Sequence, residues 1–227
     1  MVRKGGGEVK EDTGKELLLS LLDDAKALLD KDYLHEKDGK LEYTVMLQGK
    51  ESGGNVPGDD YRDCHSCPLW RSKVITPDLP FDQIDVLSVV ALPSSPASLL
   101  TREEEEMYTK EMENVLKLGF SKRRLSSILK CYSDTFDEKY ADLCKIHLRA
   151  EMAFLKPRLM ILFGSDTARY MLKSRWHGKM DDVRKKVFNI NGVETIATYS
   201  QKECISNPKL TRAVMEDLLF ALEHLGK

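Results

Sequence analysis

The sequence contains no apolar run that approaches the roughly 18 residues that a membrane-spanning helix needs. It also lacks an excess of charge of either sign, because 35 Lys and Arg residues face 37 Asp and Glu residues, for a formal net charge of -2. The overall field therefore does not favour a polyanionic partner, and any contact with nucleic acid must come from a local basic face. We expect no membrane partner.

An apolar secretory core is missing as well. The basic N-terminal residues 1–4 lead into Gly, Gly, Gly and Glu at positions 5–8, which predicts a cytoplasmic protein. Cysteine is scarce, and the five thiols are an odd number. In a reducing cytosol, clustered thiols are more often metal ligands or free thiols than disulfides, so metal binding is the leading question.

What the sequence does have is enough apolar content, 41%, to fill the core of one domain of ordinary size with an extension. Residues 15–31 place leucines at helical spacing and predict an amphipathic helix. Residues 32–60 are rich in charged residues, Gly and Asn, and predict a linker with one marginal strand at 43–47. We therefore expect a helix and linker over residues 1–58, a compact domain over residues 59–227, and a monomer.

The compact domain alternates strand-like and helix-like segments. Short apolar runs typical of buried parallel strands lie at 84–92, 125–131 and 159–164, and a hairpin at 187–199 supplies a fourth strand at 195–199. Helices are predicted at 101–118, with Thr101 as N-cap, at 142–154, at 165–173, with Ser165 as N-cap, and at 210–225. The alternation predicts an α/β sheet with helices on both faces, whose ligands bind beyond the carboxyl ends of the strands.

Two thiols at positions i and i+3, Cys64 and Cys67, can reach one metal centre. Alone, the pair fits a thioredoxin-type redox site, half of a zinc site, half of an iron–sulfur site, or coincidence. The redox interpretation requires a buried strand before the first cysteine, whereas residues 57–63 are polar turn material. A zinc ribbon requires a second close pair, and Cys131 and Cys144 are too widely spaced. Four thiolates from separate elements are a known way to hold a [4Fe–4S] cluster, whose irons prefer sulfur.

Several features occur in a characteristic order along residues 59–227. They are Cys64 and Cys67 followed by Pro68-Leu69, Lys130-Cys131 at a strand end, Cys144 at a helix start, Lys156-Pro157 before a strand that ends in Phe163-Gly164, Ala168 and Leu172 after it, and the stretch 198–208. In this order they resemble the family 4 uracil-DNA glycosylases, whose Thr-Tyr-His-Pro stretch aligns with residues 198–208 without a gap. The four cysteines and the lysine before the third are the most specific part of the similarity.

This resemblance implies a fold and a cofactor. The fold would be a three-layer α/β/α sandwich, similar to that of the uracil-DNA glycosylases, with a sheet of four mainly parallel strands. The cofactor would be a [4Fe–4S] cluster, and its four ligands would be Cys64, Cys67, Cys131 and Cys144. Cys204 has no counterpart among the ligands, and we interpret it as a free thiol beside the former active-site loop.

The positions that carry catalysis in that family differ in this sequence. Ala91 stands where the family has an acidic residue that positions water, and Ser127 replaces the Asn that reads uracil. Ser200 replaces the His that stabilises the leaving base, and Gln201 replaces the Pro after it. The stacking aromatic has no evident equivalent between residues 93 and 105. Because the loss of one electrostatic donor already costs about 10²–10³ in rate, we do not expect conventional uracil excision.

Charged residues near these positions have other uses. Asp166 fits the first turn of a helix, where the helix dipole favours an acid, and Glu203 is placed to reach the pocket. Basic residues gather into three local groups that are candidates for contact with DNA phosphates. These groups are Arg62, Arg71 and Lys73 around the cysteine loop, residues 122–124 before the second strand, and the basic residues of the run 173–186, which also contains Trp176 and His177.

The sequence therefore predicts a uracil-DNA glycosylase-like iron–sulfur protein that binds DNA or a nucleobase, with hydrolysis of the base N-glycosidic bond altered or lost. The alternative is a non-catalytic interaction protein that keeps the glycosylase fold as a scaffold and docks a protein partner through the helix at 15–31. A third hypothesis is a DNA repair enzyme, a hydrolase that removes deaminated bases with substitute residues. Salt-dependent DNA binding separates the first hypothesis from the second.

Overall fold

The computed structural model describes residues 32–37, 40–45, 60–74 and 84–226. The chain divides into two compact units, residues 1–48 and 49–227, and each is described by itself. The amphipathic helix predicted at 15–31 and the domain boundary predicted between residues 58 and 59 lie outside the described residues.

The first unit contains a short hairpin. Strand β1 (Asp32–Lys37) pairs antiparallel with strand β2 (Lys40–Val45) along their whole length. The sequence predicts a linker with a single marginal strand here, so this prediction is wrong. The overlooked signal is the Asp-Gly pair at positions 38 and 39, which favours a two-residue turn between antiparallel strands.

The second unit is built on a sheet whose described strands run in the order β6-β7-β5-β3-β4. Strand β3 (Val86–Val90) lies between β4 (Arg123–Ser127) and β5 (Leu159–Phe163) and is parallel to both. Strand β5 pairs in parallel with β7 (Val193–Thr198), and β6 (Phe188–Ile190) pairs antiparallel with β7. An α/β fold with a mainly parallel sheet is therefore confirmed.

The expected number of four strands is wrong for this unit, because the first arm of the predicted hairpin joins the sheet as β6. The turn between β6 and β7 explains how the chain folds back so tightly. Asn191 and Gly192 both have positive φ, 52° and 84°, and this is the backbone of a two-residue hairpin turn that matches the twist of the strands.

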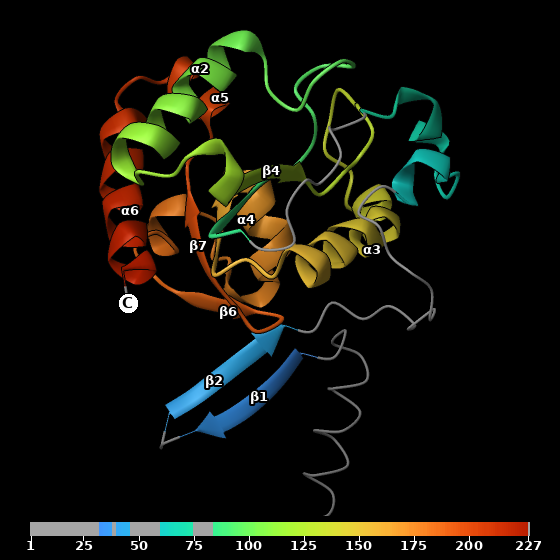
Figure 1. Ribbon diagram of the computed structural model, residues 1–227. Helices are drawn as coiled ribbons and strands as arrows, with labels where there is room; N and C mark the ends of the chain where they lie inside the picture. Colours follow the sequence, from blue (N-terminus) through green and yellow to red (C-terminus); the bar gives the residue numbers. More distant parts are fainter. Residues whose placement is uncertain (1–31, 38–39, 46–59, 75–83, 227) are drawn as a thin grey trace, which may run out of the picture. The chain divides into compact units, whose positions relative to one another are not determined.

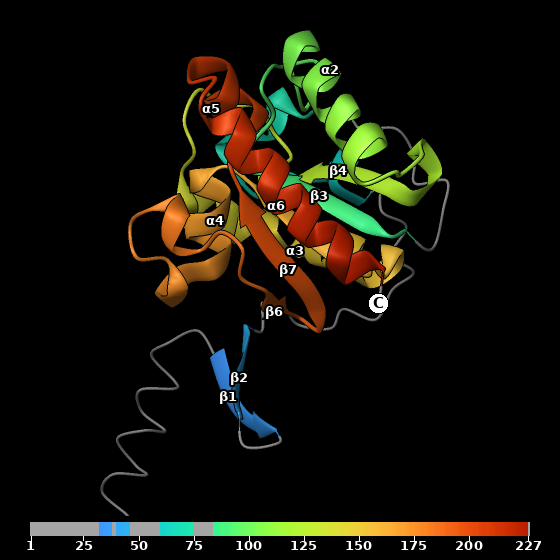
Figure 2. The same ribbon diagram turned by 90° about the vertical axis from the view of Figure 1, so that its left-hand side faces the viewer.

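Helices cover both faces of the sheet, as Figures 1 and 2 show. One face carries α2 (Arg102–Lys110), α5 (Gln201–Ser206) and α6 (Leu210–Leu225), and the other carries α3 (Glu138–Leu155) and α4 (Ser165–Leu172). Strands β3 and β5 are buried along their whole length, as expected for central strands between two helical layers. The second unit is therefore a three-layer α/β arrangement.

The predicted helix bounds agree with the structure to different degrees. Helix α6 has the predicted bounds, and Thr101 caps α2 in a capping box with Glu104, in which the Glu104 amide donates to Thr101 Oγ1 at 3.4 Å. The end of the predicted helix 101–118 differs. Helix α2 continues as a π-helical turn, η3 (Glu111–Val115), and Lys117 has a φ of 56° that ends the helix before Gly119.

Three local features depart from the prediction because side chains cap the helices differently. Helix α3 begins at Glu138 because Asp137 accepts the amide of Lys139 at 2.8 Å. Gly164, rather than Ser165, is the N-cap of α4. Helix α5 was not predicted, although Ser200 and Glu203 form the Ser-x-x-Glu capping box that marks a helix start.

Candidate metal centre

The first two cysteines lie between two short turns of 3₁₀ helix, η1 (Asp60–Asp63) and η2 (Pro68–Ser72). The amide of Cys64 donates to the carbonyl of Tyr61 at 3.1 Å, and the carbonyl of Cys67 accepts the amide of Trp70 at 3.2 Å. Pro68 fits the first position of η2 because a helix start leaves that amide without a partner in any case. These turns hold the two thiols on one compact loop.

Backbone pairing brings the third cysteine to this loop. Lys73 and Cys131 form an antiparallel bridge, the amide of Val74 donates to the carbonyl of Lys130 at 3.0 Å, and the amide of Tyr132 donates to the carbonyl of Ser72 at 2.8 Å. Cys131 was expected to end a strand, but β4 ends at residue 127 and the cysteine lies beyond it.

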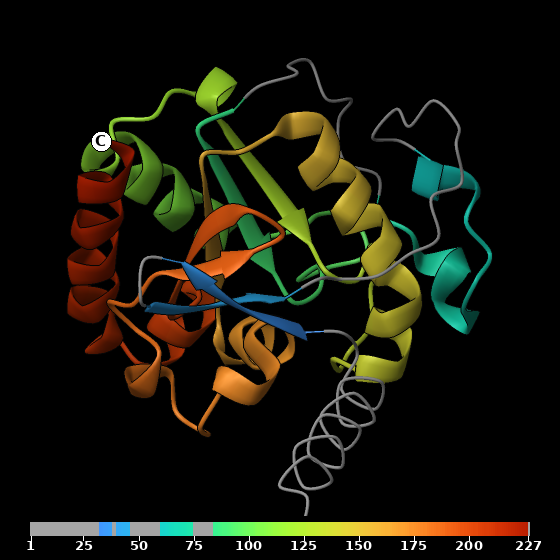
Figure 3. The same cartoon turned by 90° about the horizontal axis from the view of Figure 1, so that it is seen from below.

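The fourth cysteine comes from the helix on the same side of the molecule. Cys144 lies inside α3 rather than at its start, because that helix begins at Glu138. Figures 1 and 3 show the segment 60–74, drawn in teal, beside α3. The side chain of Cys144 is buried and its sulfur accepts the backbone amide of Lys130 at 3.3 Å.

All four predicted ligands line one pocket. The pocket has an empty volume of about 290 Å³, part of which is open to solvent, and none of the four thiols is in a disulfide. The remaining lining residues are Tyr61, Ser66, Trp70, Lys130, Leu143 and His147. The structure thus gathers thiols that are separated by up to 80 positions in the sequence, from Cys64 to Cys144.

The thiols influence one another electrostatically. Burial, followed by the charges of Cys144, Cys67 and Cys64, raises the pKa of the Cys131 thiol to about 12, and Lys73 opposes the rise. Burial also raises the pKa of Cys144, while the hydrogen bond from the Lys130 amide opposes it. Several thiolates in this pocket therefore repel one another unless a cation lies among them.

The donor set fits a cluster better than a single ion. Among the described residues, no three His, Cys, Asp or Glu side chains are arranged to converge on one metal ion. A [4Fe–4S] cluster does not need this convergence, because each cysteine binds a different iron and the ligands surround a larger volume. Four free thiols around a pocket with largely apolar walls are chemically suited to such a cluster.

The catalytic positions implied by the resemblance lie at the carboxyl ends of the strands, and their polar side chains bind within the protein. Ser127 Oγ donates to the carbonyl of Leu129 at 2.6 Å, and Ser200 Oγ donates to Glu203 Oε2 at 3.0 Å. Gln201 Nε2 donates to Glu111 Oε2 at 2.6 Å. Ala91, which follows β3, brings no polar side chain.

Glu203 joins the ends of two neighbouring strands. Its Oε1 accepts the amide and the hydroxyl of Ser165, at 3.2 and 2.6 Å, and its Oε2 accepts the amide and the hydroxyl of Ser200, at 2.7 and 3.0 Å. The approach is close, because a Cβ on Gly164 would lie 3.2 Å from the Cβ of Ser200. The carboxylate predicted to reach the pocket therefore holds the strand ends together. Asp166, in the first turn of α4, binds Arg169 at 3.0 Å as a helix-start residue does.

Sequence reasoning missed Glu111, which lies in the π-helical turn η3 and is only 5% exposed. Burial raises the pKa of Glu111 to about 7, and the hydrogen bond from Gln201 opposes the rise. No local pattern in the sequence links these two residues, which are 90 positions apart. Burial likewise raises the pKa of the Cys204 thiol on α5 to about 11, as expected for an unreactive free thiol.

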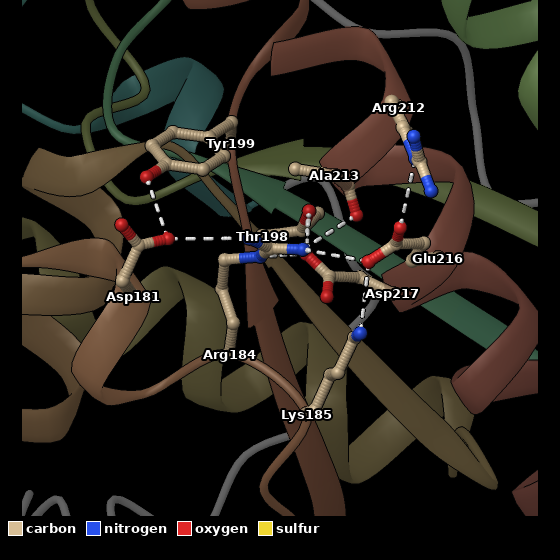
Figure 4. Close-up of polar contacts among 9 residues, drawn as sticks. All are labelled: Asp181, Arg184, Lys185, Thr198, Tyr199, Arg212, Ala213, Glu216 and Asp217. Carbon is tan, nitrogen blue, oxygen red and sulfur yellow. Dashed lines mark hydrogen bonds and ion pairs between the residues drawn. The ribbon is translucent and has the colours of Figure 1, made fainter.

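The basic run 173–186 is partly used inside the protein, as Figure 4 shows. Arg184 donates through Nε to Asp217 Oδ2 at 2.7 Å, through Nη1 to Asp181 at 3.2 Å and through Nη2 to the Ala213 carbonyl at 2.9 Å. Thr198 Oγ1 donates to the same oxygen of Asp217 at 2.6 Å. Asp217 is fully buried, so this network ties the segment before β6 to β7 and α6.

The basic residues of the cysteine loop are arranged differently. The ring of Trp70 has the guanidinium carbon of Arg71 at 5.0 Å and the ammonium of Lys73 at 5.7 Å from its centroid, and the ring of His65 at 4.4 Å. His65 and Arg71 are exposed and Trp70 is half-buried. Within the described part of the chain, no ion pair with a carboxylate is recorded for Arg71. We name these four residues the Trp70 platform.

No protein-family model and no curated protein matches this chain. Of the helices that the structure describes, none combines the length and the apolar character that a bilayer span demands.

Proposed function

We propose that this chain is an iron–sulfur protein with a uracil-DNA glycosylase-like domain, which binds DNA and lacks conventional uracil excision. One observation supports the proposal above others. The four cysteines that the resemblance marks as ligands line a single pocket, while the polar side chains at its catalytic positions are bonded within the protein.

In this proposal, Cys64 and Cys67 hold the cluster from the loop, Cys131 from the segment beyond β4, and Cys144 from α3. A bound [4Fe–4S] cluster supplies cross-linking of these segments and the capacity to accept or donate one electron. The protein contributes burial for Cys131 and Cys144 and a backbone hydrogen bond to the Cys144 sulfur. The joined loop then presents the Trp70 platform in a fixed orientation.

The Trp70 platform is the proposed contact with DNA. An unpaired base can stack on an aromatic ring with little dependence on sequence, and basic side chains beside the ring can bind the flanking phosphates. The platform combines these two elements on one loop, since Arg71 and Lys73 lie within 6 Å of the centroid of Trp70. The network of Arg184 makes the other basic run a weaker candidate.

The loss of excision follows from the groups that are missing. Hydrolysis needs an activated water and a donor that stabilises the leaving base, and each such group contributes about 10²–10³ in rate. Ala91 and Ser200 stand at these two positions by resemblance, and Ser200 is committed to the cap of α5. Glu203, the nearest carboxylate, already accepts hydrogen bonds from Ser165 and Ser200 with both oxygens.

The cluster is tested by the iron and acid-labile sulfide content of the protein and by broad visible absorbance that dithionite bleaches. We expect Cys131→Ser to lose most of the iron and Cys204→Ser, the matched control, to retain it. A fully folded protein that stays free of iron after anaerobic reconstitution would refute the cluster.

DNA binding is tested by titrating a short single strand and a duplex at several salt concentrations. We expect Arg71→Ala to reduce the slope of log affinity against log salt by about 1, and Trp70→Ala to weaken single-strand binding by about 1–3 kcal/mol. Arg102→Ala, which removes an exposed charge from α2, is the control and should leave affinity unchanged. Absence of salt-dependent binding would replace this proposal with the interaction-scaffold alternative.

Excision is tested with oligonucleotides that contain uracil, hypoxanthine or xanthine, followed by alkaline cleavage at abasic sites. We expect no strand scission above background for any of the three bases. Scission with one of them would overturn the loss of hydrolysis and favour an active glycosylase for deaminated bases.

A further inference from the structure

A buried ion pair lies against the cysteine pocket. Lys130 is 4% exposed and Glu151 is 2% exposed, and their charged atoms, Lys130 Nζ and Glu151 Oε2, are 2.9 Å apart. The ammonium also donates to Ser126 Oγ at 2.6 Å, and Ser126 in turn donates to Glu151 Oε2. The ring of Tyr61 lies 5.8 Å from the ammonium. The ammonium therefore has a fixed position.

The two charges are not equivalent with respect to the pocket. Lys130 lines the pocket together with the four cysteines, whereas Glu151 is not among the lining residues. The pair comes from two elements that the cysteines also use, because Lys130 directly precedes Cys131 and Glu151 lies on α3 with Cys144. The positive end of the pair thus faces the pocket.

Fold stability alone does not account for this arrangement. Taking two charges out of water costs several kcal/mol per ion, and well-packed apolar residues of similar volume often replace such a pair without loss of stability. A fixed ammonium beside four thiolates has a direct electrostatic effect, because the potential of an iron–sulfur cluster depends on nearby charge and on hydrogen bonds to its sulfurs. The backbone of Lys130 provides one such hydrogen bond, to Cys144.

We propose that Lys130 is a positioning residue of this centre, whose buried ammonium, held by Glu151 and Ser126, stabilises the reduced form of the cluster and so raises its reduction potential. The inference rests on the proposed cluster. The reaction concerned is the addition of one electron from an external reductant, without a change in the bonds to the four cysteines. The added negative charge is favoured by the nearby positive charge.

The test measures the midpoint potential of the reconstituted protein by titration with dithionite, followed by visible absorbance and electron paramagnetic resonance. The double variant Lys130→Met/Glu151→Gln removes both charges and leaves no buried charge without a partner. We expect its potential to be more negative, by at least about threefold in the equilibrium constant for reduction, or about 28 mV for one electron. Lys130→Arg retains the charge and should retain the potential.

Lys139→Met is the matched control, because it removes a lysine of the same helix, α3, that is exposed to solvent. We expect no change in its potential, since water screens that charge. A double variant that holds iron at the wild-type potential would overturn the role of Lys130 alone. An unchanged potential in Lys139→Met together with a positive shift in the double variant would overturn the sign of the effect. Wild-type protein without iron would instead refute the cluster itself.

Discussion

Replacement of Glu111 by glutamine is expected to make the protein more stable above neutral pH and to leave its stability nearly unchanged in acid. Glu111 is 5% exposed, and its carboxyl accepts the amide of Gln201 at 2.6 Å. The introduced amide can accept the same hydrogen bond without carrying a charge. Glu111→Gln therefore removes the cost of a buried carboxylate and keeps the contact.

The size of the effect follows from the pKa of Glu111, which burial raises from 4.5 to about 7. At about 1.4 kcal/mol for each pKa unit, the shift corresponds to about 3 kcal/mol. The folded protein binds the proton more tightly than the unfolded chain, so wild-type stability decreases as pH rises from about 4.5 to about 7. The stability difference between variant and wild type should grow through this interval and level off above it.

The assay is urea unfolding of both proteins at pH 5, 6, 7 and 8. Glu105→Gln is the control, because it makes the same chemical change on an exposed residue of α2. The difference between Glu105→Gln and the wild type should stay within about 0.5 kcal/mol at every pH. A stability difference for Glu111→Gln that does not change with pH would refute the reasoning, because it would mean that Glu111 titrates normally in the folded protein.

Three further substitutions test the packing around the strand ends. Asp217→Ala leaves the largely buried Arg184 without its closest carboxylate and should lower the free energy of unfolding by about 3–5 kcal/mol, whereas Arg212→Ala, at an exposed partner of Glu216, should change it by less than about 1 kcal/mol; urea unfolding measures both, and equal effects would contradict the buried network. Gly164→Ala should cost about 1–3 kcal/mol, because φ is 95° and the added Cβ would lie 3.2 Å from Ser200, while Gly119→Ala, with open space around it, should be neutral; a neutral Gly164→Ala would show that the strand ends separate readily. Thr101→Ala should lower the thermal midpoint by the equivalent of about 1 kcal/mol through loss of the capping box of α2, and an unchanged midpoint would mean that Glu104 alone holds the helix start.

The order of elements in the second unit could be predicted because it depends on local patterns. Continuous apolar runs mark β3 and β5, and leucine spacing marks α6 with its observed bounds. Thr101 and Glu104 show the start of α2 in four residues. The same kind of signal was present and overlooked for α5, where Ser200 was interpreted as a pocket residue rather than as a helix cap.

Other features could not be predicted because they depend on contacts between distant segments. The sequence predicts a helix up to residue 118, but the π-helical turn η3 turns Glu111 into the core, where Gln201 meets it from α5. The side chain of Arg184 looks like part of a basic run in the sequence, and only the positions of β7 and α6 show that it binds Asp217.

The cysteines separate the two sources of information most clearly. Their number, their spacing and the lysine at position 130 were enough to nominate four ligands from the sequence alone. The spacing cannot show that they meet, because the distance between two residues far apart in a chain depends on the path of the backbone between them. The pairing of residues 72–74 with 130–132, and the packing of α3 beside the loop, place all four thiols around one pocket and bring the Lys130–Glu151 pair to its wall.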